Sequence, residues 1–400
     1  MKANAFQSAD ILLPKQGLEQ WAVIACDQFT SEPDYWAAAE AAVGSAPSTL
    51  RLILPELYLN DGREARIAAI NRTMDEYLQN GVLQPYPDAM LYIERATSGG
   101  IRRGILGVID LEDYDYHKGS RTLIRATEET VLERIPPRVQ IRKDARLELP
   151  HILLLVDDPG QTVIEPLRKK KSEFEKAYDF DLMLGGGHIE GYLIHTAEKA
   201  RIAGALRALV AGRQDPLLFA VGDGNHSLAT AKACYEQSPT PQNRYALVEV
   251  VNIHDAALEF EPIYRVAFHV DPQQLLQELQ AALGGMYTGA DAQEFTYYCG
   301  GQTGALRLKP TAKLPVGTLQ AFLDGYRKAH PAAEIDYIHG KEAVKKLAAA
   351  PDTIGFLFSG MQKSELFPAI QADGSLPRKT FSMGRATDKR YYIECRKIRD

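Results

Sequence analysis

The chain has 400 residues, of which 45% are hydrophobic and 24% are charged, and its formal net charge is −6. This composition is typical of a folded globular protein of two or three domains and argues against a disordered chain. The negative charge argues against a general nucleic-acid binder, because such binding depends on Lys and Arg clusters that neutralise phosphates. The segment 121–146 nevertheless forms a local basic patch.

Four scattered cysteines form no C-x-x-C pair: Cys26, Cys234, Cys299 and Cys395. This pattern argues against a zinc ribbon or a disulfide framework and is typical of a reduced cytoplasm. The N-terminus lacks a basic start followed by an apolar stretch of signal-peptide length, and no apolar run approaches the roughly 20 residues of a membrane span. We therefore expect a cytoplasmic protein with no membrane partner.

The first half of the chain predicts alternating strands and helices from its apolar periodicity. In chain order these are a buried strand at 21–26, helices at 33–43 and 62–80, a hairpin around Ser98-Gly99-Gly100, a charged helix-compatible segment at 127–140 ended by Pro136-Pro137, a buried strand at 151–158, a helix at 163–178, a glycine turn and strand at 185–196, and a helix at 197–211. Proline at the end of a helical segment disfavours its continuation.

The second half continues the same alternation. It predicts strands at 217–221, 243–255 and 259–268, a helix from Ser227, further helices at 273–283, 316–330 and 341–349, a hairpin at 294–308, a strand at 353–358, and two polar-flanked segments at 376–384 and 390–398. Asp271-Pro272 is the expected domain boundary, so we predict a core domain at 1–271 and a smaller C-terminal α+β domain at 272–400. The interleaving of strands and helices predicts an α/β (α+β mixed) fold with a mixed sheet.

The segment LLFAVGDGNHSL, at 217–228, is the most informative part of the sequence. A buried strand stops at a Gly-Asp-Gly-Asn-His turn and a helix begins at once. Gly222 and Gly224 permit backbone angles that a side chain would forbid, and the N–H groups at a helix start carry partial positive charge. This arrangement can receive a phosphate, with the side chains of Asp223 and His226 at the same turn.

A purely structural interpretation of this turn stays open. Asp, Gly and Asn are common in tight turns, and Asn225 or Ser227 could cap the helix. The glycines match neither a P-loop nor the dinucleotide fingerprint G-x-G-x-x-G, because position 227 is Ser. Ser227 is also a poor candidate for a nucleophile, because it is not in a G-x-S-x-G context.

Polar residues at predicted strand ends form a wider set of candidates, because open α/β sheets place their sites there. The set is Asp27, Glu128, Thr130, His188, Asp223, Asn225, His226, Arg265, Lys379 and Thr380. Each of these residues taken alone is more often structural. Lys379 and Thr380 could hold a phosphate through charge and hydroxyl, although an edge strand protected by a lysine is the favoured interpretation of that segment.

A metal site can be assembled from His188, Asp223, His226 and His254, but none of them forms a short-range pair of the H-x-x-x-H kind. A dedicated zinc site is therefore not expected. Magnesium bound through Asp223 and substrate phosphates needs no such pair, and it is the more natural ion here.

The order of these motifs resembles the uncharacterised bacterial family called domain of unknown function 1015, or DUF1015. WAVIACDQFTSEPDYW is similar to the family's first motif, with Asp27 as the matching residue. TEET resembles its H-E-x-T segment through Glu128 and Thr130, with Thr127 in place of the histidine. GDGNHSL resembles its A-D-G-H-H-R-Y turn through Asp223, Gly224 and His226.

Two further motifs extend this resemblance over nearly the full chain. EPIYR is similar to the family's P-x-H-R and gives Pro262 and Arg265, and PRKTF is similar to its P-x-K-S/T-x-F and gives Pro377, Lys379 and Thr380. The central turn departs from the family at Asn225 and Ser227, where the family has histidine and arginine. Serine cannot bind a phosphate bidentately as arginine does, so we expect Arg265 or another basic residue to supply the charge.

The central turn also resembles the phosphate-binding turn of the ParB and sulfiredoxin superfamily, which includes kinases of free serine. The resemblance implies a ParB/sulfiredoxin-like nucleotide-binding core that uses ATP, ADP or CTP with Mg²⁺ and acts as a phosphotransferase on a hydroxyl-bearing small molecule such as serine. Phosphoryl transfer depends mainly on positioning and charge neutralisation. A non-catalytic nucleotide-binding switch with a protein partner and a phosphatase of a metabolite such as phosphoserine remain alternatives.

The same resemblance implies a role for each candidate residue. Catalytic residues would be Asp223, His226, Asp27 and Glu128, with Asp223 also holding the metal, and the nucleotide would be bound by Gly222, Gly224, Asn225, Ser227, Arg265, Lys379 and Thr380. Asp27 or Glu128 would act as the base. The PRKTF segment is expected to return from the C-terminal domain to this site.

Overall fold

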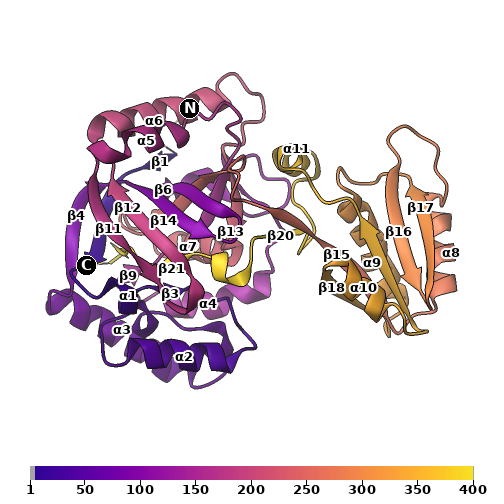
Figure 1. Cartoon of the computed structure of the whole chain (residues 1–400), viewed down its shortest axis with the longest axis horizontal. Coiled ribbons are helices and arrows are strands. Elements are labelled where there is room, and N and C mark those ends of the chain that lie inside the picture. The colour runs from indigo at the N-terminus through magenta and orange to yellow at the C-terminus, as the bar shows by residue number, and fades with distance from the viewer. Residues whose placement is uncertain (1–4, 400) are drawn as a thin grey trace. The chain divides into compact units, whose positions relative to one another are not determined.

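The structure is a computed structural model that describes residues 5–399 (Figure 1). The chain forms two compact units, Met1–Leu258 with Gly384–Asp400, and Glu259–Met383. The boundary expected at Asp271-Pro272 therefore lies inside the second unit, because the strand before it pairs within the sheet of that unit. The last residues of the chain belong to the first unit.

The first unit is built on a ten-stranded mixed sheet, which confirms the predicted fold class. Its strand order is β11 (Glu175–Leu182), β12 (Gly187–Leu193), β5 (Leu91–Thr97), β6 (Gly100–Asp110), β14 (Tyr245–Asn252), β10 (Leu153–Val156), β13 (Phe219–Asp223), β8 (Ile124–Ala126) and β7 (Tyr114–Asp115), and β1 (Phe6–Gln7) also pairs with β6. β13 is antiparallel to β10 and parallel to β8. The ends of β8 and β13 therefore meet at one edge.

Alternate residues of these strands face two separate cores. Tyr92 packs with residues of α5 (Glu165–Lys170), α6 (Thr196–Val210) and α7 (Asn225–Gln237). The neighbouring Leu91 and Ile93 pack on the other face with α2 (Pro33–Val43). α5 and α6 lie on one side of the sheet and α2 on the other (Figure 1). The sheet is thus covered on both faces, as its apolar strands require.

Shorter elements complete the first unit. They are β2 (Ala9–Pro14), which pairs with β4 (Leu83–Ala89), α1 (Leu18–Trp21), β3 (Val23–Ile24), α3 (Arg63–Gln79), α4 (Ile135–Arg142) and β9 (Leu147–Glu148). The C-terminal segment adds β21 (Tyr391–Tyr392), paired with β3, and β22 (Arg396–Lys397), paired with β9. This segment therefore ties the end of the chain to its beginning. Within residues 5–399, every helix is too short or too polar to cross a bilayer.

The second unit has an antiparallel sheet in the order β17 (Gln302–Leu308), β16 (Gln293–Cys299), β19 (Thr353–Phe358), β15 (Phe260–Phe268) and β18 (Glu334–His339). β20 (Phe381–Met383) also pairs with β15, so the edge strand expected at 376–384 is confirmed only over its last residues, and Lys379 lies in the turn before it. The unit contains the helices α8 (Pro272–Leu283), α9 (Pro315–Ala329), α10 (Lys341–Leu347) and α11 (Leu366–Asp373). The Asp271 side chain caps α8 by accepting from the N–H groups of Gln273 and Gln274.

Several predicted elements are confirmed closely, including α2 with identical bounds and the hairpin of β5 and β6. The helix expected at 163–178 is wrong over its second half, because α5 ends at Lys170 and Glu175–Leu182 is a strand. The buried residues of that strand are Tyr178, Phe180 and Leu182, so the alternating pattern outweighs the helix-forming Lys and Glu around it.

Other bounds also differ from the prediction, and β18 and α11 lie where no element was predicted. Pro136-Pro137 stands in the first turn of α4 and does not end a helix, because proline lacks the N–H that would be unpaired there anyway. The predicted strand at 21–26 is reduced to β3, with Trp21 at the end of α1. The helix expected from Ser227 begins two residues earlier, at Asn225.

Candidate functional site

The turn between β13 and α7 has a left-handed glycine at its centre. Gly224 is the N-cap residue of α7, with φ 79° and ψ 27°, and no side chain caps the helix. Asn225 and Ser227 lie inside the first turn, so the interpretation of either residue as the cap is wrong. The first N–H groups of a helix have no partner within the helix, and here they follow directly on Gly222, Asp223 and Gly224.

The backbone at Gly224 closely approaches the start of β10. A Cβ atom at this position would lie 3.1 Å from Cα of Ile152 and 3.4 Å from Cδ2 of His151. Glycine is therefore required both by the backbone angles and by this approach. The contact brings His151, which precedes β10, to the beginning of α7.

The segment after β8 supports the turn from its other side. β8 and β13 are parallel, with Ala126 opposite Val221. The next residue, Thr127, donates to the Val221 carbonyl (2.7 Å) and accepts from Nδ2 of Asn225 (3.3 Å). Oδ1 of Asn225 is buried and has no hydrogen-bond partner. Glu128 follows Thr127 at this edge and is half-buried.

The carboxylate of Asp223 is paired with a lysine from the C-terminal segment. Oδ1 of Asp223 accepts from the Gly224 N–H (3.0 Å), and Oδ2 lies 3.1 Å from Nζ of Lys389. Burial alone would lower the pKa of Lys389, but the charges of Asp223 and Asp27 outweigh it, so the pKa is raised. Lys389 is therefore an ammonium at neutral pH and lies near two carboxylates.

Asp27, three residues after β3, lies on the same side of the turn as His151. Its Oδ1 accepts from the Gln28 side chain (3.0 Å), and its Oδ2 is 3.8 Å from Nε2 of His151. Burial raises the pKa of Asp27, but His151, Gln28 and Lys389 together lower it below the ordinary aspartate value. The Asp27 carboxylate is therefore ionised at neutral pH.

A chain of hydrogen bonds runs from α7 to the C-terminal segment through His151. Nε2 of His151 lies 3.0 Å from Oγ of Ser227, and Nδ1 lies 2.8 Å from the hydroxyl of Tyr392. Tyr392 also accepts from the Cys26 N–H (3.3 Å) and contacts its Sγ (3.1 Å). Both ring nitrogens of His151 are thus engaged, and its orientation is fixed.

His226 lies in an environment that keeps its ring neutral. Its Nε2 is buried without a hydrogen-bond partner. Burial, followed by the nearby charges of Arg138 and Arg134, lowers the pKa of His226 to about 4, against a smaller opposing effect of Asp27. A neutral imidazole has one donor and one acceptor nitrogen, so His226 can form a further hydrogen bond but carries no charge at neutral pH.

These residues form one cluster, which we call the α7 site: Asp27, His151, Asp223, Asn225, His226, Ser227, Lys389 and Tyr392. Five of the eight residues are predicted from the sequence. His151, Lys389 and Tyr392 are missed, although His151 is the first residue of the buried strand predicted at 151–158. The site combines a helix N-terminus, an ammonium and two carboxylates, which can hold an anionic group beside a proton acceptor.

The predicted residues of the second unit have structural partners of their own. Arg265 is 0% exposed, and its guanidinium donates to the carbonyls of Ile263 (2.7 Å), Arg378 (3.0 Å) and Lys379 (3.1 Å). Thr380 donates to the Pro377 carbonyl (2.7 Å). The expected use of Arg265 as a phosphate-binding cation is not supported by this geometry, because its donors hold the PRKTF backbone in place.

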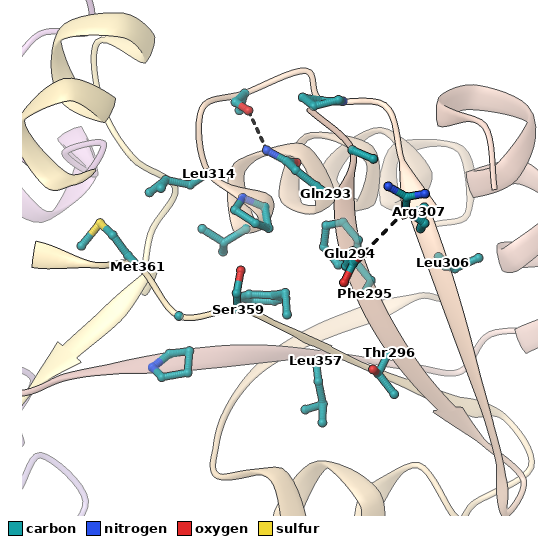
Figure 2. A pocket seen from close by; sticks show the side chains of 18 of the residues that line it. Gln293, Glu294, Phe295, Thr296, Leu306, Arg307, Leu314, Leu357, Ser359 and Met361 are labelled. Carbon is teal, nitrogen blue, oxygen red and sulfur yellow. Dashed lines mark hydrogen bonds and ion pairs between the residues drawn. The ribbon is translucent and has the colours of Figure 1, made fainter. Parts of the chain in front are cut away.

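The second unit also contains a cavity of about 1070 Å³, and Thr380 is the predicted residue in its lining. The Gln293 side chain donates to the Ala312 carbonyl (3.0 Å), and Arg307 pairs with Glu294 at 3.6 Å (Figure 2). Both acidic and basic side chains line this cavity, among them Asp291 and Lys313. Such a mixed lining favours no particular class of ligand.

The α7 site does not fit a magnesium ion at Asp223. One oxygen of that carboxylate accepts a backbone N–H and the other faces the Lys389 ammonium, which a cation would have to displace. The histidines considered with it are also engaged elsewhere. His188 pairs with Asp181 (2.7 Å), and His254 pairs with Asp157 (2.8 Å).

A family model described as "Protein of unknown function (DUF1015)" matches residues 9–326 of the chain. No curated protein matches it. Among solved structures, the chain is similar to a free serine kinase in complex with AMP, with 11% identity, a TM-score of 0.41, and coverage of 72% of this chain and 90% of the kinase.

Two further solved structures are similar to a comparable degree. A free serine kinase mutant in complex with ADP has 12% identity, a TM-score of 0.41, and coverage of 72% of this chain and 90% of that chain. A conserved hypothetical protein from Pyrococcus furiosus has 12% identity, a TM-score of 0.36, and coverage of 73% and 94%. At these values, the likeness carries no conclusion about activity.

Proposed function

We propose a function for this chain on the premise that it belongs to the DUF1015 family, whose description states no activity. The chain is a nucleotide-dependent phosphotransferase that moves a phosphoryl group to a hydroxyl-bearing small molecule. Serine is the first acceptor to test, because the central turn resembles that of the superfamily containing free serine kinases. The α7 site is the proposed centre of this reaction.

The observation that carries the proposal is the start of α7. The helix begins at a glycine, with no side-chain cap to compete for its first N–H groups. Beside it, Oδ1 of Asn225 and Nε2 of His226 are buried without partners. Unpaired buried polar atoms are costly, so their concentration at a helix N-terminus supports binding of a polar ligand there. A nucleotide fits this set, because its phosphates accept hydrogen bonds and its hydroxyls donate them.

Lys389 provides the positive charge that the turn itself lacks. Ser227 stands where the resembling family has arginine, and Arg265 is fully engaged in the second unit. The Lys389 ammonium lies 3.1 Å from the Asp223 carboxylate at the same turn. Positive charge at this point neutralises a phosphate and stabilises charge that develops during transfer. Asp223 orients the Lys389 ammonium. We propose this role for Asp223 in place of the expected role as a metal ligand.

Asp27 is the proposed acceptor of the substrate proton. The acceptor oxygen forms a bond to the terminal phosphorus of the nucleotide, while the bond from that phosphorus to the bridging oxygen breaks and its electron pair leaves with the nucleotide. The hydroxyl proton passes to the ionised Asp27 carboxylate and then to water. A carboxylate with a lowered pKa is a weak base, so its main contribution is orientation of the hydroxyl. Glu128 remains a predicted alternative.

The test is turnover by the purified full-length chain with ATP, ADP or CTP, with and without Mg²⁺, and a panel of hydroxyl compounds that includes serine. We expect phosphorylated product, loss of turnover by at least a hundred-fold in Asp27→Asn, and loss of nucleotide binding in Lys389→Met. Lys169→Met, at an exposed lysine of α5 in the first unit, is the matched control and retains both.

Other outcomes would replace the proposal. Nucleotide binding without phosphorylation of any acceptor would favour a binding switch. Release of phosphate from phosphoserine without nucleotide would favour a phosphatase. A panel in which no nucleotide binds at all would refute both nucleotide-based functions.

A further inference from the structure

A cavity of about 150 Å³ lies in the first unit and shares part of its lining with the α7 site. Its wall is mainly apolar and comes from the turn before α3, from α3 and α4, and from the segment around β9. The principal apolar residues of this wall are Leu52, Leu54, Met74, Ile141, Ala145 and Leu147.

One end of the cavity is polar, and its residues are those of the hydrogen-bonded chain described above. His151, Ser227, Tyr392 and Cys26 all line it. Ser227 Oγ and His151 Nε2 are 3.0 Å apart, so this end presents a hydroxyl and an imidazole side by side. The cavity therefore has an apolar body and a polar end directed to the site.

The two arginines that line the cavity already have carboxylate partners. Arg138 forms an ion pair with Glu56, and Arg142 pairs with Glu148 at 2.6 Å. A charged ligand group in the body of the cavity would have to displace these carboxylates. An uncharged apolar group meets no such competition.

The size of the cavity limits the group that can enter it. The cavity opens to solvent, so a ligand can enter it, and its volume limits how large an apolar group it can hold. A cavity of ~150 Å³ lined by apolar side chains binds benzene. Serine carries a single methylene and would leave the apolar wall uncovered.

We infer that the acceptor is an uncharged alcohol whose apolar body is about the size of a benzene ring, and that this body fills the cavity with the hydroxyl at the Ser227 and His151 end. The statement that this alcohol accepts a phosphoryl group rests on the proposed phosphotransferase function. The binding of the apolar body follows from the cavity alone.

The test measures binding of benzyl alcohol, 2-naphthylmethanol and serine to the full-length protein without nucleotide, by calorimetry. Ala145→Leu adds side-chain volume to the wall, and Leu54→Ala removes it. Leu83→Ala is the matched control for the second change, because Leu83 is buried in the same apolar cluster as Leu54. We expect Ala145→Leu to weaken the binding of benzyl alcohol at least ten-fold. We expect Leu54→Ala to shift the binding preference toward 2-naphthylmethanol, and Leu83→Ala to leave the preference unchanged.

The inference is overturned if a folded Ala145→Leu protein binds benzyl alcohol as tightly as wild type, or if the two leucine variants change ligand preference alike. Should Ala145→Leu fail to fold, the leucine pair decides the question. Phosphorylation of serine, with no binding or phosphorylation of benzyl alcohol, would overturn the inference and keep the phosphotransferase. Binding of benzyl alcohol as expected, with no phosphoryl transfer to any alcohol, would overturn the phosphotransferase and keep the cavity as a site for apolar groups.

Discussion

The ammonium of Lys389 lies 3.1 Å from the carboxylate of Asp223 and joins the C-terminal segment to the turn that begins α7. The pairing of β21 with β3 sets this contact, because it places Tyr392 opposite Val23 and so aligns the segment with the loop that carries Asp27. The cation of the site therefore comes from the end of the chain, after the second unit has been completed.

The Lys389–Asp223 pair predicts a coupled effect on stability and binding. Lys389→Met leaves a half-buried carboxylate without its partner, whereas Asp223→Asn together with Lys389→Met removes both charges. We expect the double variant to be less destabilised than the sum of the single variants, by about 1 kcal/mol. Urea unfolding of the four proteins gives this coupling energy, and strictly additive effects would contradict the pair.

The lowered pKa of His226 predicts a loss of stability in acid. The folded protein takes up a proton at His226 only near pH 4, whereas the unfolded chain does so near its ordinary value of 6.5. The free energy of unfolding should therefore fall as the pH falls from 7 toward 4. The urea midpoints of wild type and His226→Gln at pH 7 and pH 5 isolate the contribution of His226. The fall in midpoint between pH 7 and pH 5 should be smaller in the variant than in wild type.

A phosphate bound at the start of α7 should reverse the lowering of the His226 pKa. An anion beside Nε2 favours the protonated ring, so nucleotide should raise the pKa of His226 from about 4. NMR titration of the ring protons with and without nucleotide measures the change. An unchanged pKa in the presence of bound nucleotide would mean that the phosphates lie elsewhere.

Arg265 is expected to act on the stability of the second unit alone. It is 0% exposed and donates to the carbonyls of Ile263, Arg378 and Lys379, so Arg265→Met removes a donor that these buried acceptors share. Loss of hydrogen bonds to a charged donor costs roughly 1.5–3 kcal/mol each, and we expect a loss of about 3 kcal/mol or more. Hydrogen exchange should show faster opening of β15 and β20, with nucleotide affinity retained by the folded fraction.

Gly224 tests how strictly the turn is constrained. Alanine in a left-handed conformation costs about 1–2 kcal/mol, and at Gly224 its Cβ would also lie 3.1 Å from the backbone of Ile152. Gly212 has a φ of +71° with no atom within 4 Å of a Cβ, so Gly212→Ala measures the conformational cost alone. Thermal unfolding should show a larger loss of stability for Gly224→Ala than for Gly212→Ala. Equal losses of stability in the two variants would mean that the contact with Ile152 adjusts freely.

Local patterns were sufficient to predict the mixed α/β fold and the strand, turn and helix around Asp223. The apolar run, the glycines and the helical periodicity all lie within about twenty consecutive residues, so short-range sterics and solvation determine them. The same reasoning identified Asp27, Asn225 and His226 as candidates, the resemblance added Ser227, and these side chains do lie together. It failed for the 163–178 segment, where packing on the sheet outweighed helix propensity.

Tertiary contacts were needed to identify the charged partner of the turn. Lys379 and Lys389 are both lysines in polar C-terminal segments, and no local feature separates them. One belongs to the second unit, and the other reaches Asp223 because β21 pairs with β3. Likewise Arg265 lies in a motif typical of a binding residue, but its burial under Tyr337, 4.5 Å from the ring centre, commits its donors to the backbone. Charge on a side chain is visible in the sequence, whereas its solvation and its partners are set only when distant segments pack together.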